Sequence, residues 1–276
     1  MGEEKVKRNY KDSIFRSLFN NEKELLSLYN ALTGKNYPEG TEIEIVTLDN
    51  AVFDSKKNDL AFIVDKKFIN LTEHQSTLSP NMPLRFLEYI AKEYQKLHFS
   101  NAVYSEVLVK LPTPEFYVLY NGTKDAPLEQ TLKLSDAFVG ECDKISLDLL
   151  VKVINVNYDK GAAILDRCST LKEYSMFIHK VRTVRDELGD LDMAIDASIR
   201  ECISEGILAE FLKNNKGDVM SFLEVNLTEE EKDAIRRQDG YNEGIRDTAI
   251  KMKEEGFEYD VIERITSLSK EEIEKL

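Results

Sequence analysis

NDLAFIVDKKFINLTEHQ, residues 58–75, contains two short alternating runs separated by the polar pair Lys66-Lys67. A period of two over short runs on either side of a polar turn predicts a β-hairpin. If the turn centres on Lys66, Asp59 lies opposite Glu73 on the paired strand. Directly opposed residues on antiparallel strands have Cβ atoms about 5 Å apart, so we expect the hairpin to hold the two carboxylates side by side.

Two carboxylates at this separation suggest a site for a hard metal ion. They repel each other, and neither ionises readily unless a cation lies between them. Gln75 points from the same face of the strand as Glu73, because side chains alternate. Mg²⁺ is usually bound by one or two carboxylates together with waters and a phosphate. Asp59 and Glu73 are therefore candidate metal ligands. The alternative is two exposed acids near strand ends on an acidic protein.

The composition bounds the class of protein. The 276 residues are 42% hydrophobic and 32% charged, which is typical of a globular protein with one domain and an appendage, or with two domains. We see no apolar run near the roughly 18 residues of a membrane span and no apolar signal-peptide core at the start of the chain. We therefore expect a cytoplasmic protein without a membrane partner, and free thiols at Cys142, Cys168 and Cys202.

The net charge of −14 is unevenly distributed along the chain. Residues 1–110 hold 15 Lys/Arg and 16 Asp/Glu, whereas residues 111–276 hold 22 and 35. Contacts to phosphates supply most of the affinity of proteins for nucleic acids, and they need positive charge. We therefore expect any contact with nucleic acid to be local and to use the first part of the chain.

Helices and strands alternate in this first part. Residues 10–33 carry an apolar stripe at helical spacing, and Gly34 suits a helix C-cap. Asp12 lies at the edge of this stripe. It is either drawn toward the core or is an acid of the first helical turn, favoured by the helix dipole. Residues 41–48 alternate and predict a strand. Residues 116–120 predict another strand, which Asn121-Gly122 closes.

A second helix is predicted from Pro83 to about His98. We expect its buried side to consist of Leu84, Leu87, Ile90, Ala91, Tyr94 and Leu97. A second stripe combines Arg85, Tyr89, Lys92 and Lys96. This stripe is either a solvated basic face or a track for DNA phosphates. Its position directly after the hairpin favours the phosphate track.

The remainder of the chain is predicted to be mostly helical. Residues 147–156 form a strand or a short helix, and residues 171–188, 190–211 and 228–238 predict helices. The glycine-punctuated segment 241–276 predicts further helices that form a helical hairpin or a contact between copies of the chain, including residues 259–266 and 270–276. We therefore expect three regions, 1–135, 136–240 and 241–276, with the sheet in the first.

The order helix, strand, strand, strand, helix, strand, with Asp59 and Glu73-His74-Gln75, resembles the PD-(D/E)xK nuclease superfamily. More narrowly, the chain resembles the recombination-promoting nuclease/transposase (Rpn) family of bacteria. The resemblance covers residues 10–122, through YKDSIFRSLF (10–19), EHQSTLSPNMPLRFLEYIAKEY (73–94) and PTPEFYVLYNG (112–122). The tail, which ends in LSKEEIEKL, is also similar. The resemblance implies an α/β fold with an αβββαβ core and a mostly helical C-terminal region.

The resemblance also implies roles for the motif residues. Asp59 would be the principal ligand of Mg²⁺ or Mn²⁺, Glu73 the second, and the backbone carbonyl of His74 a third. Gln75 occupies the position that usually holds a lysine. A lysine would add positive charge at the attacking water, whereas glutamine can only donate and accept hydrogen bonds. Asp12 matches a helix-borne acid that could hold a metal-bound water.

Arg85 and Tyr89 would face the scissile phosphate in such an enzyme. The leading hypothesis is a Mg²⁺-dependent endonuclease acting on double-stranded DNA. A second is a nuclease-fold binding or assembly module that is weakly active or inactive. A third is a regulatory protein whose acidic face binds a basic partner. Binding of a divalent ion by Asp59 and Glu73 distinguishes them.

Overall fold

The computed structural model describes most of the chain, in two compact units. The described residues are 14–46, 59–99, 104–140, 144–221, 223, 241 and 244–274. The first unit comprises residues 1–223 and the second residues 224–276. Asp12 and the helix expected at residues 228–238 lie outside the described residues.

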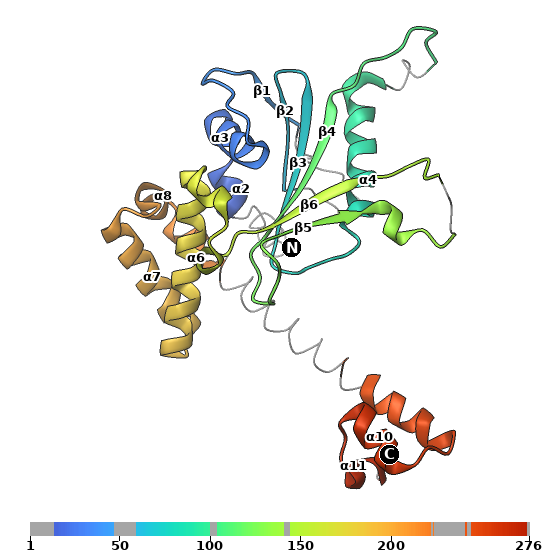
Figure 1. Ribbon diagram of the computed structural model, residues 1–276. Helices are drawn as coiled ribbons and strands as arrows, with labels where there is room; N and C mark the ends of the chain where they lie inside the picture. Colours follow the sequence, from blue (N-terminus) through green and yellow to red (C-terminus); the bar gives the residue numbers. More distant parts are fainter. Residues whose placement is uncertain are drawn as a thin grey trace, which may run out of the picture. The chain divides into compact units, whose positions relative to one another are not determined.

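A six-stranded mixed sheet forms the centre of the first unit (Figure 1). Its strands are β1 (Ile43–Ile45), β2 (Leu60–Val64), β3 (Phe68–Gln75), β4 (Thr113–Tyr120), β5 (Glu129–Lys133) and β6 (Leu150–Asn155). They lie in the order β1-β2-β3-β4-β6-β5. Strands β3, β4 and β6 are parallel to one another, whereas β1–β2, β2–β3 and β5–β6 are antiparallel pairs. The predicted α/β class is confirmed.

The hairpin of β2 and β3 has the predicted register. Leu60 pairs with Thr72 and Val64 with Phe68, so the turn centres on Lys66. Asp65 and Lys66 have φ angles of 50° and 53°, which places both in the left-handed region that tight turns use. Continuation of this register beyond Leu60 places Asp59 opposite Glu73, as the sequence predicted.

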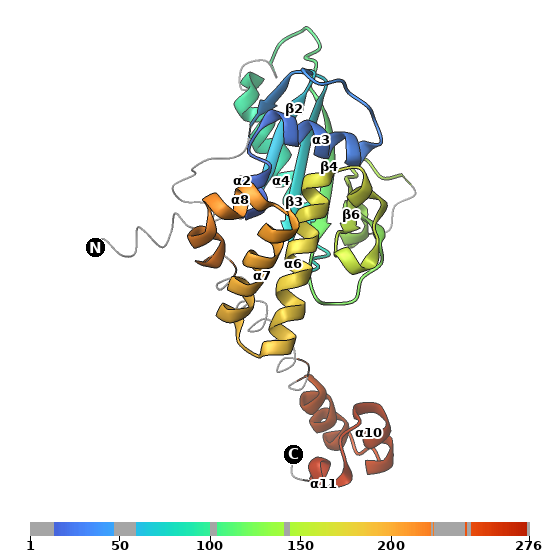
Figure 2. The ribbon, with the colours of Figure 1, turned by 90° about the vertical axis from the view of Figure 1, so that its left-hand side faces the viewer.

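Helices cover both faces of the sheet (Figure 2). Helix α4 (Met82–Tyr94) covers one face, and its buried residues form one core cluster with residues of β2, β3, β4 and β6. Helices α3 (Glu22–Thr33) and α6 (Ser169–Leu188) lie on the other face. There the ring of Tyr29 packs edge-on against Phe62, with centroids 6.2 Å apart.

Two of the predicted helices are interrupted in the structure. Residues 10–33 were expected to form one helix, but α2 (Ile14–Leu18) ends before Asn21, whose side chain accepts a hydrogen bond from the backbone of Glu24 and so begins α3. Gly34 ends α3 with a φ of 73°, as expected. The helix expected over residues 190–211 is divided into α7 (Leu191–Glu205) and α8 (Ala209–Asn214). Gly206, with a φ of 82°, separates them.

The buried side of α4 was predicted in part incorrectly. Leu84 is 51% exposed and Ala91 is exposed, whereas Phe86 and Tyr89 are buried. Ile90 is buried as expected, and Leu87, Tyr94 and Leu97 pack against the same core cluster. Burial of the larger Phe86 and Tyr89 side chains removes more apolar surface from water than burial of Leu84 and Ala91 would. Residues 95–99 continue α4 as a π-helix.

The sheet extends past the boundary expected at residue 135. Residues 147–156, predicted as a strand or a short helix, contain strand β6, which lies between β4 and β5. Strand β5 was not predicted, because only Gln130 and Leu132 of its five residues are partly buried and the alternation is short. Cys168 and Cys202 are free, as expected, and both are buried, whereas Cys142 lies outside the described residues.

The second unit is a small helical assembly. Residues 244–254, α10 (Tyr259–Thr266) and α11 (Lys270–Glu274) are its described helices, and Ala249, Ile262 and Ile273 form its core. The helix predicted over residues 259–266 is confirmed. Among the helices described in either unit, none is long and apolar enough to cross a membrane.

Candidate functional site

The candidate site lies at one edge of the sheet. Strands β3, β4 and β6 are parallel, so their carboxyl ends meet at this edge, where the antiparallel β2 begins. Asp59 precedes β2, Glu73 lies near the end of β3, and Asn121 follows β4. Open α/β sheets commonly bind ligands outside the carboxyl ends of their parallel strands. The fold therefore brings polar side chains together where sheets of this kind commonly bind ligands.

Asp59 and Glu73 perturb each other's ionisation. Burial raises the pKa of Glu73 to about 8, and the negative charge of Asp59 adds to this rise, while Arg85 lowers it in part. Burial also raises the pKa of Asp59, to about 6. The hydrogen bond that Asp59 Oδ2 accepts from the backbone N–H of His74 at 2.7 Å lowers this pKa in part. Ionising both carboxyl groups at once is therefore unfavourable, because two buried negative charges repel each other. A bound cation would offset this repulsion.

Arg85 and Tyr89 of α4 complete this side of the site. Arg85 Nη2 donates to Glu73 Oε2 at 3.0 Å and contacts the Tyr89 hydroxyl at 3.1 Å. The Tyr89 side chain is buried in the core between α4 and the sheet. The structure therefore brings together four residues that the sequence assigned to the site. Lys96, in the π-helix that continues α4, lies 3.7 Å from the carboxylate of the buried Glu93.

His74 points to the opposite face of the sheet. Its ring stacks on Phe15 with a centroid distance of 4.6 Å and meets Tyr174 edge-on at 5.2 Å. Burial, assisted by the charge of Arg182, lowers the pKa of His74 to about 3, so the imidazole is neutral. The imidazole of His74 packs against these two rings, while the backbone N–H of His74 orients Asp59. Coordination by the His74 carbonyl stays a prediction.

Arg182 of α6 was not identified from the sequence. Its guanidinium donates to the side-chain oxygen of Asn121 at 2.8 Å, to the backbone carbonyl of Asn121 at 2.7 Å and to Asn157 Oδ1 at 3.1 Å. It thereby fastens α6 to the ends of β4 and β6. The backbone N–H of Asn121 donates in turn to the carbonyl of Gln75 at 3.0 Å. No spacing in the sequence signals contacts across 61 and 25 residues.

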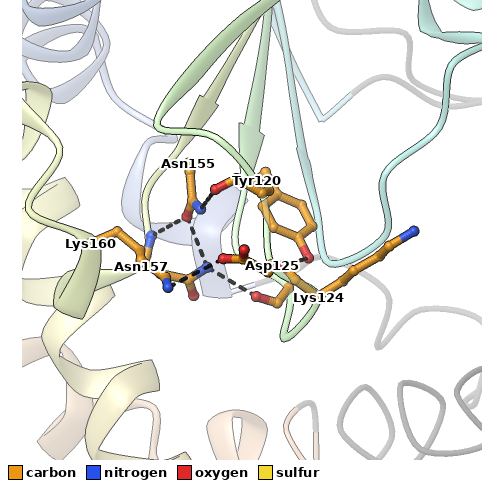
Figure 3. Close-up of polar contacts among 8 residues, drawn as sticks. Tyr120, Lys124, Asp125, Asn155, Asn157 and Lys160 are labelled. Carbon is orange, nitrogen blue, oxygen red and sulfur yellow. Dashed lines mark hydrogen bonds and ion pairs between the residues drawn. The ribbon is translucent and has the colours of Figure 1, made fainter.

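The loop after β4 is held by asparagine side chains (Figure 3). Asn157 Nδ2 donates to the carbonyl of Gly122 at 2.9 Å, and Asn155 Nδ2 donates to the carbonyl of Ala126 at 3.2 Å. The Tyr120 hydroxyl donates to the carbonyl of Lys124 at 2.8 Å. These bonds fix the backbone beside the end of β3, and so support the strand that carries Glu73.

Replacing Gly122 with alanine is expected to destabilise the first unit. A Cβ at this position would lie 1.8 Å from the backbone carbonyl oxygen of Ser76, which follows β3 and cannot move as a side-chain end could. We expect a loss of about 2 kcal/mol or more in urea unfolding. Gly217→Ala is the matched control, because nothing lies within 4 Å of its Cβ position, and it should be neutral or stabilising. Equal stability of the two variants would contradict the close approach.

The donor set suits a hard divalent cation. Asp59 and Glu73 provide carboxylate oxygens, the ligand type that Mg²⁺ and Mn²⁺ prefer. Glu73 Oε1 is buried and has no hydrogen-bond partner among the described residues. The described part of the chain contains no group of three His, Cys, Asp or Glu side chains placed to share a metal, so main-chain oxygens, water or substrate would supply the remaining ligands. Asp12, the third acid expected from the sequence, is not among the described residues.

The site is therefore a pair of carboxylates on a hairpin, flanked by an arginine and a tyrosine on the covering helix. Its geometry rests on the observed register of β2 and β3 and on the contacts of Arg85. Comparison of the chain with protein-family models, with curated proteins and with solved structures gives no match.

Proposed function

We propose that this protein is a Mg²⁺- or Mn²⁺-dependent endonuclease of the recombination-promoting nuclease type, which hydrolyses phosphodiesters of double-stranded DNA. The observation that supports this most is the placement of Asp59 opposite Glu73 at the carboxyl edge of the sheet, with the pKa of both carboxyl groups raised. A divalent cation bound there would activate a water molecule and neutralise charge that builds on the phosphate.

The residues of the chain have distinct roles in this proposal. Asp59 and Glu73 hold the cation, and the His74 N–H fixes the orientation of Asp59. Gln75 orients the attacking water, because an amide donates and accepts hydrogen bonds but carries no charge. Arg85 is a permanent cation beside Glu73, and Tyr89 holds its guanidinium in place.

The second candidate is a nuclease-fold binding or assembly module with weak or no turnover. Gln75 favours it, since the position that would carry a lysine's charge is neutral. The acidic second half of the chain also favours a role in assembly, because it repels DNA.

Supercoiled plasmid distinguishes the two candidates. An endonuclease should nick or linearise it with Mg²⁺ or Mn²⁺ and should leave it intact with EDTA. Cleavage that persists in EDTA would exclude the proposed metal site. Binding of a divalent ion without any cleavage would favour the module.

Lys92 and Lys96 are proposed to contact DNA phosphates, as the sequence suggests. Replacing both with alanine should weaken DNA binding equally for all sequences and flatten the dependence of log affinity on log salt by roughly two units, about one for each lysine–phosphate pair that is removed. A salt titration with a labelled duplex in Ca²⁺ measures this slope, and Lys110→Ala on an exposed loop is the control. An unchanged slope in the double variant would show that the two lysines make no contact with DNA phosphates.

A further inference from the structure

The ion pair between Arg85 and Glu73 joins a buried acceptor to a donor at the surface. The Glu73 side chain is 6% exposed and that of Arg85 is 40% exposed. Arg85 Nη2 contacts both Glu73 Oε2 and the Tyr89 hydroxyl, and Nη1 lies 3.3 Å from the sulfur of Met82, a weak acceptor. The guanidinium is thus held mainly through one nitrogen, and its fork of donors is only partly engaged by these contacts.

A divalent cation bound by Glu73 would compete with Arg85 for the same carboxylate. Two cations at one carboxylate repel strongly where little water screens them. The net charge of the site would also change sign on binding of the cation. With both acids ionised, Asp59, Glu73 and Arg85 together carry one negative charge, which repels phosphate. A divalent cation changes this sum to one positive charge, which attracts phosphate.

We infer that Arg85 is a phosphate-binding residue, and that a divalent cation at Asp59 and Glu73 controls its availability to DNA. This inference rests on the proposed function and adds a regulation of the same site. When the cation engages Glu73, the guanidinium leaves the carboxylate and binds a phosphate of the DNA backbone. A planar guanidinium suits this exchange, because its paired N–H groups match the oxygens of either a carboxylate or a phosphate.

The exchange makes cation binding and DNA binding cooperative. Arg85 weakens the binding of the cation when DNA is absent, because it holds Glu73, and strengthens DNA binding once the cation has released it. By thermodynamic linkage, DNA must strengthen the binding of the cation by the same factor by which the cation strengthens the binding of DNA. Removing Arg85 should therefore reduce the coupling without reducing the affinity for the cation.

Duplex binding by fluorescence anisotropy, in Ca²⁺ and in EDTA, measures this coupling without relying on cleavage. We expect Ca²⁺ to strengthen the binding of a labelled duplex to the wild-type chain about tenfold or more. Arg85→Gln should lose the part of this strengthening that Arg85 supplies, while the charge of the cation still supplies the rest, and it should bind Ca²⁺ in calorimetry at least as tightly as the wild type. Arg85→Lys, which keeps the charge but not the fork, should retain part of it. Lys110→Gln removes a positive charge from an exposed loop and should behave as the wild type.

The outcomes separate this inference from the proposed function. Full strengthening by Ca²⁺ in a folded Arg85→Gln variant would overturn the inference, as would a loss of its affinity for Ca²⁺. Ca²⁺ that binds the wild-type chain without affecting DNA binding would also overturn the inference, but would leave the proposed metal site intact. A wild-type chain that binds neither Ca²⁺ nor Mn²⁺ would refute the proposed function, and the inference with it.

Discussion

Asp59→Asn and Glu73→Gln are each expected to reduce metal-dependent cleavage of plasmid DNA at least about 100-fold. Even the replacement of residues that only support metal ligands commonly reduces metal affinity or activity 10–100-fold. Both substitutions keep the size of the side chain but remove a charge that would bind the cation. The asparagine of the first variant retains an oxygen that can accept the hydrogen bond from the His74 N–H, so we expect the hairpin to keep its register.

Asp65→Asn provides the control for this prediction. Asp65 lies in the turn at the other end of the same hairpin, where its carboxylate contacts Lys67 at 2.6 Å, and asparagine tolerates its positive φ. This variant should cleave DNA as the wild-type chain does. Equal activity in all three variants would show that Asp59 and Glu73 do not carry the chemistry.

Mn²⁺ is expected to raise the melting temperature of the wild-type protein. A ligand at 100 times its dissociation constant stabilises the folded state by about 2.7 kcal/mol. For a unit of this size, that corresponds to roughly 5–10 °C. The shift should disappear in Asp59→Asn. Differential scanning fluorimetry with and without millimolar Mn²⁺ makes the measurement.

Without added metal, Asp59→Asn should itself melt slightly above the wild type at pH 8. The folded protein raises the pKa of Asp59 to about 6, so ionisation of this group destabilises the folded state. The destabilisation is complete above pH 6 and disappears as the pH falls toward 4. The difference in melting temperature between Asp59→Asn and the wild type should therefore also disappear toward pH 4.

For the prediction with Mn²⁺, an equal shift of the melting temperature in the wild type and in Asp59→Asn would place the cation elsewhere.

The hairpin could be predicted from the sequence because its information is local. Alternation on both sides of Lys66 determines the register, and the register alone brings Asp59 to Glu73. Helix α4 was placed correctly, but its buried side was predicted only in part. Only packing against the sheet determines that Phe86 and Tyr89 are buried while Leu84 is exposed, because apolar and aromatic residues lie on several sides of this helix.

Other parts of the site depend on contacts between segments that are distant in the sequence. Arg182 reaches Asn121 across 61 residues, and the ring of Tyr174 meets His74 across the face of the sheet. The resemblance to the nuclease superfamily implied that Arg85 would face the scissile phosphate, which stays a prediction. Its ion pair with Glu73 could not be predicted, because it depends on the rotation of α4. The break at Gly206 was overlooked because the residues on both sides of it continue the helical pattern.

Titration of the protein with Mn²⁺ by isothermal calorimetry tests the central claim most directly, because the claim is that Asp59 and Glu73 together bind a divalent cation. The wild-type chain should bind the ion at this site, and the variant that combines Asp59→Asn with Glu73→Gln should lose that binding. Undiminished stoichiometry and affinity in the folded double variant would contradict the account.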